Sequence, residues 1–137
     1  MDASQVLCFA GLALFMLGLL NGFAIPRMRS PRLGLSAHLT GVQAGTFLIA
    51  VGLMWPRLAL SGAWSAGLAN GLWVSLGLIW ASLVLAGAFG AGQGLAIAGQ
   101  GMTTTPGRQR LVSALLAAGS LGCLVVVAAL LALWRWR

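Results

Sequence analysis

Residues 111–134 read LVSALLAAGSLGCLVVVAALLALW and contain no charged side chain. A helix needs roughly 20 mostly apolar residues to cross the hydrocarbon core of a bilayer, so this stretch alone is long enough. Further charge-free stretches lie at 3–26, 33–56 and 58–107. Together they predict four transmembrane helices, near 6–25, 37–55, 66–90 and 111–134. We therefore expect an all-α polytopic membrane protein, a four-transmembrane-helix bundle that forms a single domain over 1–137.

The composition supports a membrane protein and excludes an ordinary soluble domain. Hydrophobic residues make up 60% of the chain and charged residues 7%, whereas about 25% of the residues in soluble domains are charged. All eight basic residues are arginines, placed in the predicted loops and tail at positions 27, 29, 32, 57, 108, 110, 135 and 137. Arginines at the headgroup level are expected to contact anionic lipid of the bilayer. They do not indicate nucleic-acid binding.

The distribution of the arginines also predicts an orientation. With four spans, the first and third loops share one side of the membrane and carry five arginines, against three on the other side. The positive-inside rule then places both termini outside the cytoplasm. We expect a multi-pass protein of the bacterial inner (cytoplasmic) membrane.

Few side chains are available for chemistry. The chain has one histidine, His38, and one acid, Asp2. A zinc site needs three or four protein ligands, a Ser–His–carboxylate triad needs its acid, and proton-coupled transporters rely on acids within the membrane. One histidine and one acid near the N-terminus disfavour all three kinds of site. A single imidazole is compatible with a five-coordinate haem whose sixth position stays open, and such an iron can act as a Lewis acid.

The surroundings of His38 in the sequence suggest a binding surface. Ser36 is a plausible N-cap of the second helix, which would place His38 in its first turn. At about 100° per residue, positions 38, 41, 45 and 52 share one stripe, so Gly41 and Gly45 would leave room beside the histidine for a flat group. Glycines at four-residue spacing also predict close helix packing, at Gly18/Gly22, Gly41/Gly45, Gly67/Gly71 and Gly90/Gly94.

Two amides lie within the predicted spans, Gln43 in the second and Asn70 in the third. Polar groups are costly inside a membrane and tend to mark function. An amide buried without partners loses about 1–3 kcal/mol, so Asn70 must find a backbone group, another side chain or a ligand. Helix packing and a functional role are both compatible with this residue.

Several segments carry a recognisable pattern, and the most specific is 30–39, SPRLGLSAHL. Further matching segments are NGFAIP at 21–26, Gly41, Gly45, LMWP at 53–56, Ala69-Asn70, FGAGQ at 89–93 and IAG at 97–99. Over nearly its whole length, the chain in this way resembles the hydroxylaminobenzene mutases, which rearrange hydroxylaminobenzene to 2-aminophenol in bacterial nitroaromatic degradation. The resemblance implies an isomerase acting on a small aromatic hydroxylamine.

A more distant resemblance reaches styrene oxide isomerase, a four-helix membrane enzyme that forms trimers around b-type haem. Its haem-ligating histidine lies in an Ala-His segment that matches Ala37-His38, and an asparagine of its third helix matches Asn70. Three other positions depart from that enzyme: Ala44 replaces an asparagine, Val74 a tyrosine and Ala66 an aspartate. The departures argue against epoxide isomerisation and for the mutase activity.

The two resemblances together imply a site. His38 would bind the iron of ferric haem b in a homotrimer, with Gly41 and Gly45 beside the macrocycle and Arg32 or Arg29 meeting its propionates. Asn70 would orient the substrate or its leaving oxygen, and Gln43 is a second candidate for this catalytic role. The substrate ring would lie among Phe47, Leu72 and Trp73.

Two alternatives stay open. The first is a haem-free isomerase that uses His38 as an acid, although positioned proton transfer contributes only about 10²–10⁴-fold to a rate. The second is a non-catalytic small membrane protein, either a channel or transporter or a structural subunit of a larger complex. In that case His38 could be replaced without consequence.

Overall fold

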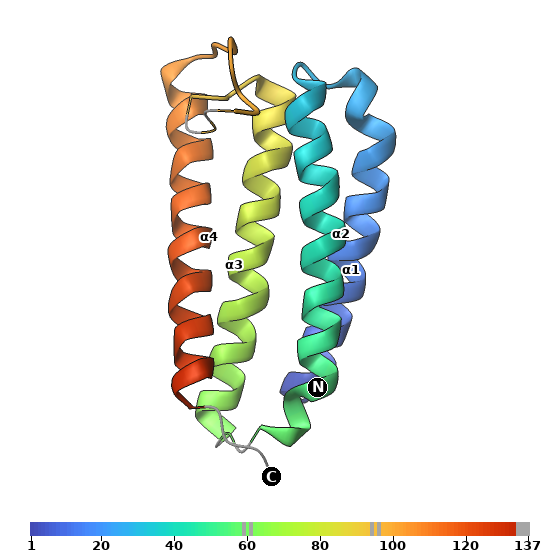
Figure 1. Cartoon of the computed structure of the whole chain (residues 1–137), viewed down its shortest axis with the longest axis vertical. Helices are drawn as coiled ribbons and strands as arrows, with labels where there is room; N and C mark the ends of the chain where they lie inside the picture. Colours follow the sequence, from blue (N-terminus) through green and yellow to red (C-terminus); the bar gives the residue numbers. More distant parts are fainter. Residues whose placement is uncertain (59, 61, 94, 96, 134–137) are drawn as a thin grey trace.

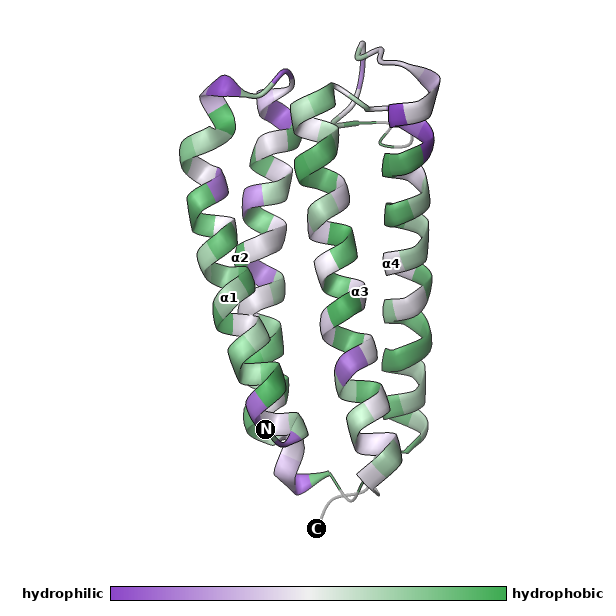
Figure 2. Ribbon diagram, turned by 180° about the vertical axis from the view of Figure 1, so that it is seen from behind, coloured by the Kyte–Doolittle hydropathy of each residue, from purple (hydrophilic) through white to green (hydrophobic). Residues whose placement is uncertain are grey.

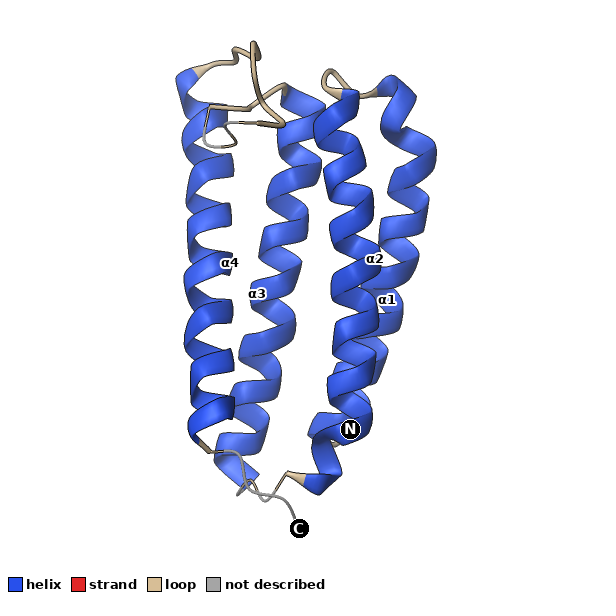
Figure 3. Cartoon of the chain, in the orientation of Figure 1, coloured by secondary structure: helices blue, strands red, loops and turns tan. Residues whose placement is uncertain are grey.

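The computed structural model describes residues 1–58, 60, 62–93, 95 and 97–133. The described residues form four long helices, α1 (Ala3–Ala24), α2 (Pro31–Met54), α3 (Gly62–Phe89) and α4 (Pro106–Ala132). Short 3₁₀ turns, η1 (Ile25–Arg27) and η2 (Trp55–Arg57), follow α1 and α2. All four helices are long and apolar enough to cross a membrane. The prediction of an all-α, four-span protein is confirmed (Figures 1 and 3).

The helix starts differ from the predicted ones because local capping groups set them. Ser30 is the N-cap of α2, its hydroxyl accepts from the Leu33 amide at 3.4 Å, and Pro31 occupies the first turn, where its missing N–H costs nothing. The prediction that Ser36 caps this helix is wrong, since its hydroxyl donates to the Arg32 carbonyl within α2 at 3.2 Å. His38 therefore lies about two turns inside α2 rather than in its first turn.

The basic residues lie at the helix ends. The α1–α2 and α3–α4 connections meet at the same end of the molecule (Figure 1), so the described arginines of the first and third loops share that end, as predicted. Arg32, Arg108 and Arg110 belong to helices, however, because Pro31 and Pro106 begin α2 and α4 earlier than expected. Arg135 and Arg137 lie outside the described residues. The orientation across the membrane stays a prediction.

Glycines bring α1 and α2 into backbone contact. A Cβ added at Gly18 would lie 2.7 Å from the Val42 nitrogen, and one at Gly41 would lie 2.6 Å from the Gly18 Cα. A Cβ at Gly45 would lie 2.6 Å from the Phe15 nitrogen. The predicted packing role of Gly18, Gly41 and Gly45 is confirmed, because only hydrogen fits at these positions.

The other predicted glycine pairs behave differently. Gly67 faces open space, whereas a Cβ at Gly71 would lie 2.9 Å from the Val126 side chain. Gly90 has a φ of +67°, a left-handed conformation that favours glycine and ends α3. Gly94 lies outside the described residues. Among the four predicted pairs, backbone-to-backbone contact is therefore found at glycines of α1 and α2.

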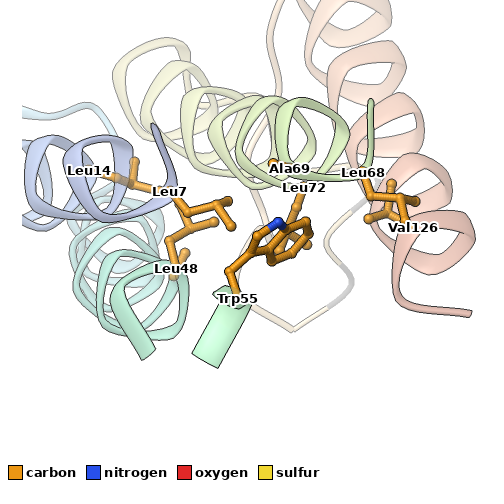
Figure 4. Packing of buried hydrophobic residues seen from close by; sticks show 9 residues of the cluster. Leu7, Leu14, Leu48, Trp55, Leu68, Ala69, Leu72 and Val126 are labelled. Carbon is orange, nitrogen blue, oxygen red and sulfur yellow. The ribbon is translucent and has the colours of Figure 1, made fainter. Parts of the chain in front are cut away.

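The remaining helices pack in sequence: α3 contacts α1 and α2, and α4 packs against α3. The main core lies where α1, α2 and α3 meet, and it includes Leu7, Leu48 and Leu72, which are fully buried, and Trp55 (Figure 4). The Trp55 indole N–H donates to the Ser65 hydroxyl at 2.8 Å. The start of α3 is in this way bonded to the end of α2. Figure 2 shows hydrophilic bands within α1, α2 and α3, and an α4 that is white to green between its ends.

Candidate functional site

His38 lies on the face of α2 that packs against α1. It is half-buried, and its Nδ1 lies 2.8 Å from the Gly18 carbonyl oxygen. A carbonyl oxygen can only accept a hydrogen bond, so Nδ1 carries a proton, and in the neutral imidazole Nε2 then bears the lone pair. Nε2 makes no hydrogen bond to any residue that the structure describes. This is the arrangement of metal-binding histidines, in which a bond at one ring nitrogen fixes the tautomer for ligation by the other.

Close helix packing is what allows this bond. A Cβ added at Gly22, one turn beyond Gly18, would lie 3.1 Å from Nδ1 of His38. The absence of side chains at Gly18 and Gly22 therefore lets the imidazole approach the α1 backbone. The sequence predicted a helix-packing role for these two glycines but gave no sign that a carbonyl there would bind the histidine.

The glycine stripe of α2 does not provide the predicted space. The faces of Gly41 and Gly45 are covered by the backbone of α1, and the Trp80 indole also contacts Gly41. The prediction that these glycines leave room for a flat group is wrong, because helix packing fills that room. Within the described residues no group of three or more His, Cys, Asp or Glu could hold a metal ion by itself.

Gln43 faces a different side of α2. It lies about 140° around the helix from His38, and it lines a groove of about 260 Å³ with Thr40, Phe47 and Leu76. Gln43 and His38 are thus not brought together within one chain. The groove is wide open, so a ligand bound in it would also contact lipid or another protein chain.

Asn70 lies on the outer face of α3, and its side chain is exposed. Its Oδ1 accepts a hydrogen bond from the Trp73 indole N–H at 3.0 Å. This bond orients the amide and leaves Nδ2 free as a donor toward any residue or ligand that approaches, since no described residue accepts from it. Asn70 was expected to need a hydrogen-bonding partner. For its Oδ1 that partner is Trp73, one turn away on the same helix.

His38 and Asn70 lie at different depths in the bundle. Gly34 packs against Gly87 and Gly41 against Trp80, which fixes the antiparallel register of α2 and α3. On this register Asn70 lies about 13 residues below His38, which corresponds to roughly 20 Å along the helix axes. Within a single chain, one small substrate therefore cannot contact His38 and Asn70 at the same time.

A cavity of about 410 Å³ lies between α1 and α3. Its lining is apolar and includes Phe9 and Leu17 of α1 and Trp73, Gly77 and Trp80 of α3. The three apolar residues expected around the substrate ring do not share this cavity. Trp73 lines it, Phe47 lines the groove on α2, and Leu72 is fully buried in the core.

Arginines surround Phe89 near the end of the bundle that is closer to His38. Arg29 donates to the Phe89 carbonyl at 3.5 Å, and Arg108 lies over the Phe89 ring, 4.7 Å from its centroid. Arg32 is exposed in the first turn of α2, about 9 Å from His38 along the helix and about 120° around it.

Fold and site together define a polytopic α-helical membrane protein with a single, tautomerically fixed histidine and an apolar cavity. Residues 3–136 match the model of the styrene oxide isomerase family. The chain belongs to this family.

Two curated relatives match shorter parts of the chain. Hydroxylaminobenzene mutase HabB of Ectopseudomonas oleovorans is 64% identical over 45 residues, which cover 33% of this chain and 27% of that protein. Hydroxylaminobenzene mutase HabA of the same organism is 46% identical over 52 residues, 37% of this chain and 38% of that protein. The matched part thus spans well under half the length of either relative. No solved structure matches the chain.

Proposed function

We propose that this protein is an isomerase that rearranges an aryl hydroxylamine, hydroxylaminobenzene, to the ortho-aminophenol. Membership of an isomerase family and the names of the two relatives support this assignment. In the reaction the N–O bond breaks, a C–O bond forms at the ortho carbon, and that carbon loses a proton while nitrogen gains one. Because no electrons are gained or lost overall, neither an oxidant nor a reductant is required.

His38 is the residue that we propose would hold a haem b. The observation that carries the proposal is the bond from its Nδ1–H to the Gly18 carbonyl, which leaves the Nε2 lone pair available. A ferric haem, when bound, would supply a Lewis acid to assist N–O cleavage. Gly18 would hold the imidazole in the ligating tautomer, and Arg29 and Arg32 are the candidates for pairing with propionates.

The other candidates have separate roles in this proposal. Asn70 is a candidate for a further polar contact with the substrate through its free Nδ2. It lies about 20 Å in depth from His38, so it would not hold the N–O bond whose cleavage a haem on His38 would assist. Gln43 remains the second candidate for a polar contact, from the groove on α2. The apolar surroundings keep water away from the reacting nitrogen and oxygen, which strengthens each of these hydrogen bonds.

A homotrimer in the bacterial cytoplasmic membrane is the assembly that we propose, by analogy with the trimeric isomerase that the chain resembles. Rotation about an axis normal to the membrane does not change the depth of any residue. Assembly of this kind would thus bring different faces together but would leave His38 and Asn70 about 20 Å apart in depth.

The test is an absorption spectrum of the detergent-purified protein, oxidised and reduced, beside an assay of 2-aminophenol formation. We expect a Soret band that is lost in His38→Ala and kept in Ser36→Ala, a matched change of another half-buried polar residue on the same helix. A colourless but active protein would favour a haem-free isomerase that uses His38 as an acid. A protein inert toward hydroxylaminobenzene would favour the non-catalytic alternative and refute the proposed activity.

A further inference from the structure

Five of the described arginines lie at the end of the bundle where the α1–α2 and α3–α4 connections meet (Figure 1). They are Arg27, Arg29, Arg32, Arg108 and Arg110. No acidic side chain lies among them, because the one acid of the chain, Asp2, caps α1 at the opposite end of that helix. Positive charges that gather without a counter-charge repel one another. A bound anion would relieve this repulsion.

Two of these arginines, Arg29 and Arg108, converge on Phe89 at the end of α3. Arg29 crosses Gly90, where an added Cβ would lie 3.1 Å from its Cδ and 3.3 Å from its Nε. Its Nη1 donates to the Phe89 carbonyl at 3.5 Å. The guanidinium carbon of Arg108 lies 4.7 Å from the centroid of the Phe89 ring, which is within the range of a cation–π contact. Two cations from different connections are thus held around one residue.

Most of the hydrogen-bond donors of these two guanidinium groups remain free. A guanidinium carries five N–H donors, of which Arg29 uses one on the Phe89 carbonyl, and Arg108 donates none to a described residue. Arg108 also lies in the first turn of α4, at the positive end of the helix dipole, where a cation is unfavourable. Guanidinium groups bind phosphate oxygens in a bidentate manner. The free donors and the positive potential therefore fit a phosphate.

The apolar surface beside the two arginines favours a phosphate that belongs to a lipid. Leu111 follows Arg108 by three residues, so it lies next to Arg108 one turn deeper into the span, and it is 48% exposed. Ile97 of the α3–α4 connection is 87% exposed. The α4 helix is also the least covered of the four, since 11% of its most apolar stretch is buried, against 28% to 33% for the others. A phospholipid has a phosphate at the headgroup level and acyl chains that would cover this surface.

We propose that Arg29 and Arg108 hold the phosphate of one anionic phospholipid, whose acyl chains lie along the exposed face of α4. This is a defined site that joins the α1–α2 connection to α4, and it differs from the general attraction of arginines to a charged membrane. Only the two arginines held at Phe89 contribute to it. The site does not depend on the proposed isomerase activity, and Arg32, which makes neither contact, is left as the candidate for a haem propionate.

The site is tested by native mass spectrometry of the detergent-solubilised full-length protein, titrated with phosphatidylglycerol to give a Kd. We expect Arg29→Gln and Arg108→Gln each to raise this Kd about tenfold, because each loses a charge-assisted bond to the phosphate. Arg27→Gln is the matched control, since Arg27 is exposed in the same connection as Arg29 and does not contact Phe89. Its Kd should stay within about twofold of the wild-type value. An equal rise in Arg27→Gln and Arg29→Gln would indicate diffuse attraction and overturn the proposal.

The role of Phe89 is tested without changing any charge. Phe89→Leu removes the ring over which Arg108 lies, and the loss of an exposed cation–π contact should raise the Kd for phosphatidylglycerol about threefold. Phe23→Leu is the control, because Phe23 is an exposed phenylalanine near the same end of α1; its Kd should not change. If Phe89→Leu binds the lipid as tightly as Phe23→Leu does, the two arginines are not held by Phe89 and the proposed site is wrong.

Two further ligands separate an anionic lipid from other sources of phosphate. Phosphatidylcholine has the same phosphodiester but adds a choline cation, so it should bind at least about tenfold more weakly than phosphatidylglycerol. Inorganic phosphate has no acyl chain, so a millimolar concentration should leave most of the phosphatidylglycerol bound. Equal binding of the two lipids would contradict the need for a negative charge. Displacement of phosphatidylglycerol by inorganic phosphate would assign the site to a free anion, and either result would overturn the proposal.

Discussion

Gly18→Ala is the change whose effect can be worked out most directly from the structure. The new Cβ would lie 2.7 Å from the Val42 nitrogen and 2.8 Å from the Gly41 carbonyl carbon. Both are backbone atoms of α2, so no side-chain rotation can relieve the contact. An ordinary contact needs at least 3.4 Å, and the two helices must therefore separate by about 0.7 Å at this level, a form of overpacking.

This separation acts on His38 as well as on stability. If the helices move apart by about 0.7 Å, the 2.8 Å bond from Nδ1 to the Gly18 carbonyl lengthens toward 3.5 Å, where a hydrogen bond is much weaker. Overpacking of this kind costs about 1–3 kcal/mol of unfolding free energy. We expect Gly18→Ala to lower the unfolding free energy by that amount and to weaken the binding of any ligand that depends on the tautomer of His38.

The assay is thermal unfolding of the detergent-solubilised protein, followed by tryptophan fluorescence, with Gly67→Ala as the control. An alanine at Gly67 meets open space, and alanine is about 1 kcal/mol more favourable than glycine in a helix, so the control should be neutral or slightly stabilised. If Gly18→Ala unfolds at the same temperature as Gly67→Ala, the helix contact is not as close as described, and the reasoning about His38 fails with it.

Two further substitutions test the packing around the site. Asn21 is buried and donates from Nδ2 to the Gly34 carbonyl at 2.9 Å, so Asn21→Ala should cost about 1 kcal/mol in the same unfolding assay; no loss would show that this carbonyl finds another donor. A Cβ at Gly119 would lie 2.8 Å from the Ser75 carbonyl oxygen. Gly119→Ala should therefore destabilise the α3–α4 contact by about 1–3 kcal/mol, and protease cleavage in the α3–α4 connection should become faster than in Gly67→Ala.

The number and type of the helices could be predicted because four charge-free stretches leave few alternatives in a bilayer. The start of α2 could not be predicted from apolarity, because it depends on Ser30 and Pro31, which lie outside the apolar stretch. Ser36 looked like an equally good cap. In the structure Ser30 is the cap, because its hydroxyl accepts from the Leu33 amide and Pro31 occupies the first turn.

The candidate site was predictable in its residue types more than in its geometry. A lone histidine is visible in any sequence, and the sequence singled out His38 as the candidate ligand. Its partner was not foreseen, since the Gly18 carbonyl belongs to a different helix and carbonyls leave no sequence signature. The separation of His38 from Asn70 also depends on the register between α2 and α3, which is set by the contacts of Gly34 and Gly41 and not by spacing along either helix.

The bond between His38 and Gly18 has a consequence for biosynthesis. Both partners belong to the hairpin of α1 and α2, which leaves the ribosome before α3 and α4. The glycines that set the distance between these two helices belong to the same hairpin. The histidine can therefore acquire its partner and its tautomer before α3 and α4 have been translated, and a cofactor could be loaded onto a half-made protein.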